Sequence, residues 1–333
     1  MSELLARLPL IVLGCGSWGT ALALYGATRF EQLKLWGPFA DEIKALNQDR
    51  ENKKYIPGAK FPKHLVCTSS LADAFEADAL VLMCVPSHVF VDTLKQLKPF
   101  VSKIKTLIIA TKGVTEDGLF LHEIAEEILN VPVAILSGPS FAKEVAMKMP
   151  TSVSLASKSA EVLKEITPLF HSAFFRIYPS TDVRGVAIGG VVKNVIAIAV
   201  GISDGLGFGA NARAALITKG LHEMSLLSKA VGGQLDTIMS LAGLGDMVLT
   251  TTDNQSRNRR FGLALGQGQA VEAAEQSIGQ VVEGKRNVKE LLLMAKQYDV
   301  ELPICTQVEQ VIYGAKPAQG AMLDLLNLPI QHT

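Results

Sequence analysis

The chain has 333 residues, of which 48% are hydrophobic and 19% are charged. This length exceeds what one hydrophobic core usually supports, so two soluble globular domains are expected. The 32 basic and 32 acidic residues balance, which argues against a dedicated nucleic-acid or membrane-surface binder. The four cysteines form no Cys-x-x-Cys pair, which favours reduced thiols over a disulfide framework or a zinc site.

The first expected element is a buried strand over Leu8–Leu13, followed by a Gly-x-Gly-x-x-Gly motif and a helix over Thr20–Ala27. In this motif Gly14 permits a tight turn, Gly16 lets the backbone approach a pyrophosphate, and Gly19 lets helix and strand pack closely. The pyrophosphate would lie at the helix N-terminus, where unpaired amides and the helix dipole meet it. An ordinary glycine-rich turn is the alternative.

A second strand is expected over Leu33–Trp36, and its end should lie near the adenosine ribose of a bound dinucleotide. An acidic residue there would favour NAD, and a basic residue would hold the 2′-phosphate of NADP. The chain instead has Pro38, with Asp41 and Glu42 slightly later. The choice between the two cofactors therefore stays open.

Strand and helix candidates then alternate, which predicts a parallel sheet covered on both faces. The strands are expected over Ala79–Val85, Thr106–Ala110, Val133–Leu136, Thr151–Ala156 and Phe174–Tyr178, and the helices over Val89–Leu97, Leu119–Leu129 and Ala160–Phe170. Ligands bind outside the carboxyl ends of such strands. Lys112 is well placed there to meet a phosphate or a carbonyl, with a solvated loop lysine as the alternative. His88 is interpreted as a loop or cap residue.

The alternation stops near Asp182-Val183, where we place a boundary between domains over 1–182 and 183–333. Beyond it, helices are expected over Val186–Gly201, Ala210–Ser228, Gln234–Ala242, Arg259–Leu265, Val271–Ser277, Val288–Gln297 and Thr306–Tyr313. A last helix around Gly320–Leu326 should precede a loose tail. The predicted fold class is an α/β Rossmann-type parallel-sheet domain followed by an all-α domain.

The first helix of the second domain contains one charge, Lys193, in an otherwise apolar stretch. A buried lysine is costly unless it has a partner or a task. Its helical face is shared by the small residues Gly190, Ala197 and Gly201, with Asn194 beside it. This low face predicts clearance for a ligand, so we expect the chain to bring a cofactor and a substrate to Lys193.

Two membrane-directed interpretations are disfavoured. Lys193-Asn194 interrupts the apolar helix, and no apolar run reaches the ~18–20 residues of a membrane span. Cys15 ends a stretch that resembles a lipoprotein cleavage site, but the preceding apolar run is brief and its flank contains Glu3.

Polar clusters follow in the helical domain. Asp246 lies between glycine-permitted bends, with a helix-capping aspartate as the alternative. The stretch 250–260 combines hydroxyls, amides and guanidinium groups, and it suits phosphate capture because arginine binds oxyanions bidentately and helix amides add donors. A solvated charged face is the alternative, whereas a nucleic-acid patch is disfavoured by the lack of aromatics. Gln280–Gly284 could close over a cofactor, although its pattern alone predicts a loop.

A dinucleotide-binding half and a helical half with a lysine, an acid and a phosphate-type cluster suggest hydride transfer on a small phosphorylated substrate. Oxidising an alcohol needs a base for the hydroxyl proton, and the reverse reaction needs the same group to protonate the forming alkoxide. The chain has no zinc-ligand spacing, so the lysine is expected to replace a metal as the electrophilic group.

In order and combination, the motifs of the chain resemble the bacterial NAD(P)-dependent sn-glycerol-3-phosphate dehydrogenases over nearly the whole length. The motifs are GCGSWGTALA at 14–23, KG at 112–113, SGPSFA at 137–142, VKNVIA at 192–197, GLGD at 243–246, SRNRRFG at 256–262 and VVEG at 281–284. After the second strand this family often carries Arg or His for the 2′-phosphate, whereas this chain has Pro38. The preference between NADH and NADPH is therefore open.

The resemblance implies that Lys193 is the proton donor and acceptor, and that NAD(P)H is the cofactor. It implies substrate contacts from Lys112, Gly138, Ser140, Lys193, Asp246, Ser256, Arg257 and Asn258. It implies dinucleotide contacts from Ser17, Trp18, Lys112, Ala142, Arg257, Val281 and Glu283, beside the motif glycines Gly14, Gly16 and Gly19. It also implies a cytoplasmic enzyme that makes glycerol 3-phosphate for phospholipid synthesis.

The expected partner is thus a small-molecule substrate, with no nucleic acid and no membrane, and a homodimer is left open. Two other functions also stay open. A 3-hydroxyacid dehydrogenase of the 6-phosphogluconate type also uses a lysine followed by asparagine, although 243–246 and 256–258 favour glycerol phosphate. A non-catalytic dinucleotide sensor would bind the cofactor tightly without turnover.

Overall fold

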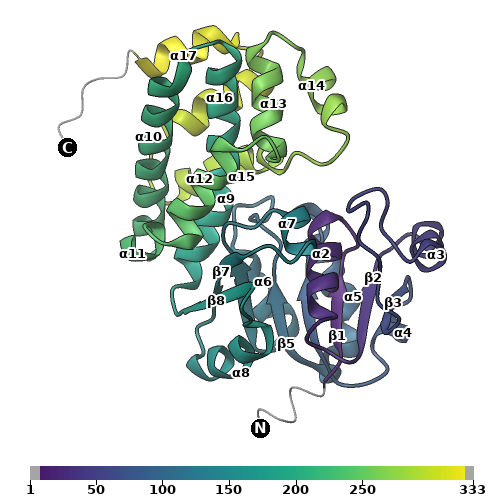
Figure 1. The fold of residues 1–333 in the computed structure, drawn as a ribbon. Helices are drawn as coiled ribbons and strands as arrows, with labels where there is room; N and C mark the ends of the chain where they lie inside the picture. The colour runs from purple at the N-terminus through teal and green to yellow at the C-terminus, as the bar shows by residue number, and fades with distance from the viewer. Residues whose placement is uncertain (1–7, 327–333) are drawn as a thin grey trace. The chain divides into compact units, whose positions relative to one another are not determined.

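The computed structural model describes residues 8–326, so the expected tail after Leu326 lies outside the described residues. The chain divides into two compact units (Figure 1). The first comprises Met1–Lys112 and Phe120–Val183, and the second comprises Gly113–Leu119 and Arg184–Thr333. The strands belong to the first unit, and the second unit is helical.

The first unit is built on an eight-stranded sheet in the order β3-β2-β1-β4-β5-β6-β7-β8. The strands are β1 (Leu10–Leu13), β2 (Leu33–Trp36), β3 (Leu65–Thr68), β4 (Ala79–Met83), β5 (Ile104–Ile109), β6 (Val133–Ser137), β7 (Thr151–Ala156) and β8 (Phe175–Ser180). Leu10–Leu13 are completely buried at the centre, so the run before Cys15 is a core strand. All four cysteines are free thiols, as predicted.

One strand pair departs from the predicted parallel sheet, because β6 and β7 are antiparallel. The other neighbouring strands are parallel. Only the short helix α7 (Ala142–Ala146) lies between β6 and β7. Its length of about 7.5 Å cannot return the chain along a strand of about 16 Å, so β7 runs back beside β6.

The other helices of this unit follow the expected alternation. They are α2 (Ser17–Gly26), α3 (Ala40–Asp49), α4 (Leu71–Ala74), α5 (Phe90–Leu97), α6 (Leu121–Leu129) and α8 (Ala160–Phe170), with 3₁₀ turns η1 (Ser87–Val89) and η2 (Lys98–Lys103). Neither β3 nor the helices α3, α4 and α7 had been predicted from the sequence. Because β3 lies at the edge of the sheet and leaves Val66 46% exposed, its apolar pattern is weak.

The second unit is organised around α9 (Val183–Gly205), a buried core helix. The helices that follow are α10 (Gly209–Ala230), α11 (Leu235–Ile238), α12 (Asp246–Thr252), α13 (Arg257–Gly266), α14 (Val271–Ile278), α15 (Glu283–Gln297), α16 (Pro303–Tyr313) and α17 (Ala318–Leu326). By length and hydropathy α9 could cross a membrane, but 94% of its most apolar window is buried inside the protein. A helix that is apolar all round is typical of such a core position.

Glycines let α13 touch α9. A Cβ added at Gly201 would lie 2.2 Å from the carbonyl oxygen of Arg259, and one at Gly262 would lie 2.1 Å from that of Ile198. The predicted ligand clearance is therefore wrong at Gly201, because the backbone of α13 occupies that space. Small residues on a helix serve equally for close helix packing, which the spacing alone did not distinguish.

Two further boundaries differ from prediction. The helix expected over Gln234–Ala242 consists of α11 and a separate π-helical turn, η3 (Leu241–Gly245). The loop expected at Gln280–Gly284 ends early, because Glu283 and Gly284 form the start of α15.

The segment Gly113–Leu119 belongs to the helical unit, although it lies between β5 and α6 in the chain. Gly118 has φ +74°, and a Cβ there would lie 3.0 Å from the amide nitrogen of Met294 in α15. Gln297 Nε2 also donates to the Asp117 carbonyl oxygen at 3.0 Å. The segment is thus held against α15.

Candidate active site

The glycine motif forms a tight turn from β1 into α2. Gly14 has φ +108°, and a Cβ added at Gly19 would lie 1.8 Å from the Gly14 carbonyl oxygen. A Cβ at Gly16 would meet nothing within 4 Å, so the space before α2 is open. Since no side chain caps α2, its first amides can receive an anion. This cradle fits the pyrophosphate of a dinucleotide.

Asn52 supports this turn, although it is not among the predicted site residues. Its buried side chain donates to the Cys15 carbonyl oxygen at 2.9 Å and to Thr20 Oγ1 at 2.8 Å. Thr20 Oγ1 itself donates to the Cys15 carbonyl oxygen at 3.2 Å. Asn52 lies in a turn-rich stretch without periodicity, and nothing in the sequence links it to the glycine motif.

A second group of predicted residues lies at the carboxyl ends of the neighbouring strands β5 and β6. Lys112 Nζ donates to the Gly138 carbonyl oxygen at 3.3 Å, and Ser140 Oγ donates to the same oxygen at 3.0 Å. Gly138 has φ +147°, and a Cβ there would lie 2.9 Å from Val153 Cα. The parallel β5–β6 pairing therefore brings Lys112, Gly138 and Ser140 together, with Ala142 at the start of α7.

In the helical unit, Lys193 on α9 lies beside Asp246 and Thr250 on α12. The lysine is 6% exposed and the aspartate 0%. Lys193 Nζ donates to the Asp246 carboxylate and, at 3.0 Å, to Thr250 Oγ1. The carboxylate offsets the cost of burying an ammonium group, and the hydroxyl adds a second acceptor. Thr250 was predicted as part of the phosphate-capture stretch 250–260, but its hydroxyl lies beside Lys193. It follows Asp246 by one turn and so shares its helical face.

An asparagine pair joins α9 to α13 and α15. Asn258 Nδ2 donates to Asn194 Oδ1 at 2.9 Å, and the Gly284 amide donates to Asn258 Oδ1 at 2.9 Å. Asn194 Nδ2 lies 3.5 Å from Glu283 Oε2. Asn194 therefore lies between the predicted residues Asn258 and Glu283 and contacts both. The sequence had indicated Asn194 only as a neighbour of Lys193.

The first turn of α13 carries the predicted phosphate cluster. Ser256 is its N-cap, and its Oγ accepts from the Arg259 amide at 3.2 Å. Arg257 is half-buried, and its Nη1 donates to Gln280 Oε1 at 3.3 Å. Val281, which follows Gln280, is 48% exposed. A helix N-terminus with an arginine in its first turn suits an anion.

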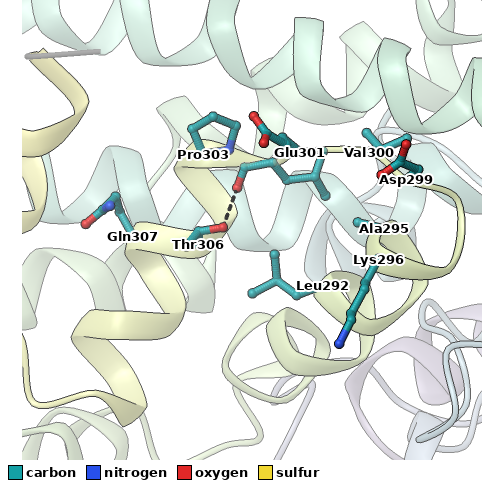
Figure 2. A pocket seen from close by; sticks show the side chains of 10 residues that line it. Leu292, Ala295, Lys296, Asp299, Val300, Glu301, Pro303, Thr306 and Gln307 are labelled. Carbon is teal, nitrogen blue, oxygen red and sulfur yellow. Dashed lines mark hydrogen bonds between the residues drawn. The ribbon is translucent and has the colours of Figure 1, made fainter.

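The helical unit also has a surface pocket of about 440 Å³ at the junction of α15 and α16 (Figure 2). Lys296, Asp299 and Glu301 contribute charged groups to its lining, and Thr306 Oγ1 donates to the Leu302 carbonyl oxygen at 3.0 Å. None of the predicted site residues lines this pocket. Among residues 8–326, no group of three His, Cys, Asp or Glu side chains could hold a metal ion.

Comparison with known proteins matches both parts of the chain. Residues 9–163 match the family model described as the NAD-dependent glycerol-3-phosphate dehydrogenase N-terminus, and residues 182–323 match that of the C-terminus. Glycerol-3-phosphate dehydrogenase (NAD(P)+) of Colwellia psychrerythraea is 51% identical over 320 residues, which cover 95% of this chain and 96% of the relative.

Other relatives extend the likeness. The enzyme of that name from Vibrio cholerae is 50% identical, over 95% of this chain and 93% of the relative. The crystal structure of glycerol-3-phosphate dehydrogenase from Coxiella burnetii has a TM-score of 0.94 at 42% identity, covering 96% of this chain and 99% of that one. The yeast enzyme has a TM-score of 0.82 at 26% identity, covering 96% and 99%.

Proposed function

The chain belongs to the NAD-dependent glycerol-3-phosphate dehydrogenase family, and from this premise we propose that it reduces dihydroxyacetone phosphate to sn-glycerol 3-phosphate with Lys193 as the proton donor. The observation that carries this proposal is the buried contact of Lys193 with Asp246 and Thr250. The product supplies phospholipid synthesis, and the enzyme acts in the cytoplasm on a small-molecule substrate. A homodimer is the proposed assembly.

The proton chemistry follows from the lysine and its two acceptors. A bound nicotinamide would supply the hydride to the carbonyl carbon. Negative charge then develops on the carbonyl oxygen, and the Lys193 ammonium stabilises it and transfers a proton to it. Asp246 and Thr250 hold Nζ in place, and Asp246 keeps a countercharge beside the ammonium. In the oxidation direction, the neutral amine accepts the hydroxyl proton.

Substrate and cofactor contacts are proposed for the remaining predicted residues. Ser256, Arg257 and Asn258 bind the substrate phosphate at the start of α13. Substrate contacts are also proposed for Lys112, Gly138 and Ser140, which lie together in the first unit. Gly14, Gly16, Ser17, Trp18, Gly19 and Ala142 contact the dinucleotide, together with Lys112, Arg257, Val281 and Glu283. The main support is local: the open cradle before α2 and the anion-suited first turn of α13.

The purified chain, mixed with dihydroxyacetone phosphate and NADH or NADPH, should oxidise the reduced cofactor. Lys193→Ala should lower kcat by ~10²–10⁴-fold, as for loss of a positioned proton donor, and leave the cofactor Kd unchanged. Wild-type protein without turnover with either cofactor would contradict the proposed reaction. Turnover of 6-phosphogluconate in a parallel assay would favour the related hydroxyacid dehydrogenases, and tight cofactor binding without any turnover would favour a sensor.

A further inference from the structure

We propose that Arg259 is a positioning residue that acts through a buried ion pair with Asp204. It positions residues 256–258, the phosphate turn, which are proposed to bind the substrate phosphate. Arg259 Nη2 lies 2.6 Å from Asp204 Oδ2, and the two side chains are 9% and 6% exposed. Separating the pair would leave the buried Arg259 guanidinium without its countercharge, so Arg259 favours this arrangement. The inference rests on the proposed function, because it assigns the substrate phosphate to the first turn of α13.

The ion pair joins two elements that carry different parts of the proposed chemistry. Asp204 lies near the end of α9, three turns beyond Lys193 on the same helix. Arg259 lies in the first turn of α13, directly after Ser256, Arg257 and Asn258. The pair therefore fixes the phosphate turn relative to the helix of the proton donor.

The ion pair adds to the backbone contact and to the Asn258–Asn194 hydrogen bond between these helices. Gly201 and Gly262 bring α9 and α13 into direct contact, which sets their separation. Arg259 links α9 to the segment before residues 256–258, because it pairs with Asp204 on α9 and also donates from Nη1 to Asn254 Oδ1.

Arg213 on α10 provides a matched control. Its Nε and Nη2 lie 3.0 Å and 2.9 Å from Asp204 Oδ1, the other oxygen of the same carboxylate. Its side chain is 34% exposed, and the contacts place it between α10 and α9 rather than on α13. Removing Arg213 takes one cation from Asp204 and leaves the link to α13 in place.

The test compares Arg259→Met and Arg213→Met in the full chain, with kcat, the two KM values and Tm measured. Arg259→Met should raise KM for dihydroxyacetone phosphate about tenfold or more, since displacement of a substrate-binding group is expensive. KM for the cofactor should rise less than KM for dihydroxyacetone phosphate, because only Arg257 of residues 256–258 is also assigned to the cofactor, and kcat should fall less than KM rises. Arg213→Met should leave all three constants unchanged. Asp204→Asn, which keeps the side-chain shape, should repeat the KM effect if Arg259→Met does not fold.

Three results would overturn the inference. An unchanged KM for dihydroxyacetone phosphate in a folded Arg259→Met or Asp204→Asn protein removes the positioning role. Equal losses for substrate and cofactor together with a lower Tm show a purely structural role. A wild-type protein without turnover removes the proposed function and this inference with it, whereas wild-type turnover with an unaltered KM in the variants removes this inference alone.

Discussion

Gly16 and Gly19 lie in one motif but have different surroundings, which makes them a matched pair of sites. An alanine at 19 would place its Cβ 1.8 Å from a backbone oxygen, whereas one at 16 would enter open space. Gly19→Ala should therefore destabilise the fold by about 1–3 kcal/mol, the usual range for overpacking. Gly16→Ala should leave Tm unchanged and weaken NADH binding, since its methyl group enters the pyrophosphate cradle; thermal unfolding and NADH titration check both. Equal effects of the two variants would contradict this assignment.

The residue that follows β2 and Gly37 should decide between the two nicotinamide cofactors. Pro38 is exposed there, and Asp41 and Glu42 form the first turn of α3. Acidic groups near this strand end favour an unphosphorylated ribose, and Lys54 is already paired with Glu42 at 3.1 Å. We expect the wild-type chain to bind NADH more tightly than NADPH.

Pro38→Arg should shift this preference by adding a guanidinium group for the 2′-phosphate. The ratio of Kd for NADPH to Kd for NADH, from titration of nicotinamide fluorescence, should fall about tenfold, equivalent to about 1.4 kcal/mol. The NADH affinity of the variant serves as the control, because that ligand has no 2′-phosphate. An unchanged ratio of the two Kd values would show that the 2′-phosphate of NADPH binds away from residue 38.

Among the helices, α16 begins with a cap supplied by another element. Glu223 on α10 accepts from the Ile304 amide at 2.6 Å and from the Cys305 amide at 3.3 Å. Glu223→Ala would leave both buried donors unpaired, so the free energy of unfolding should fall by about 1–3 kcal/mol. Urea unfolding of the variant beside wild type measures the difference. A change below the error of the fit would show that water replaces the carboxylate.

The same carboxyl group gives the stability a defined pH dependence. Burial raises the pKa of Glu223 from 4.5 to about 7. A raised pKa means that the folded state binds the proton more tightly, so the contribution is complete below pH 4.5 and is lost as pH rises through about 7. Glu223→Gln should flatten the decline in unfolding free energy between pH 4.5 and about 7. Burial also raises the pKa of Glu290 to about 7, so part of the decline should persist.

The elements differ in how far the sequence predicts them. Central strands such as β1 and β4 are continuous apolar runs, and they were predicted because burial on both faces leaves a clear pattern. The direction of β7 was not predictable from alternation, since it depends on the length of α7. The cost of burying a charge predicted that Lys193 would have a partner or a task. Asn52 and the Asp204–Arg259 pair, by contrast, join positions that share no sequence pattern.

The whole molecule consists of two compact units, and each unit is formed by two separate segments of the chain. Residues 113–119 join the helical unit although their neighbours on both sides belong to the sheet unit. A fragment that ends at Val183 would keep every strand but lose α15, which holds Asp117 and Gly118. We expect this fragment to fold, but a protease should cleave it rapidly within residues 113–119. The full chain should stay intact under the same conditions. Equal cleavage of the two proteins would contradict the assignment of residues 113–119 to the helical unit.

The assignment of residues 113–119 to the helical unit also affects how genes for such enzymes can be recombined. A single genetic crossover near residue 183 would pair a loop inherited from one parent with an α15 inherited from the other. Gly118 has a left-handed backbone conformation and packs tightly against that helix, so parents that differ at this contact should yield poorly folded chimaeras. Libraries that exchange residues 113–119 together with the helical half should contain more active members than libraries made with one crossover.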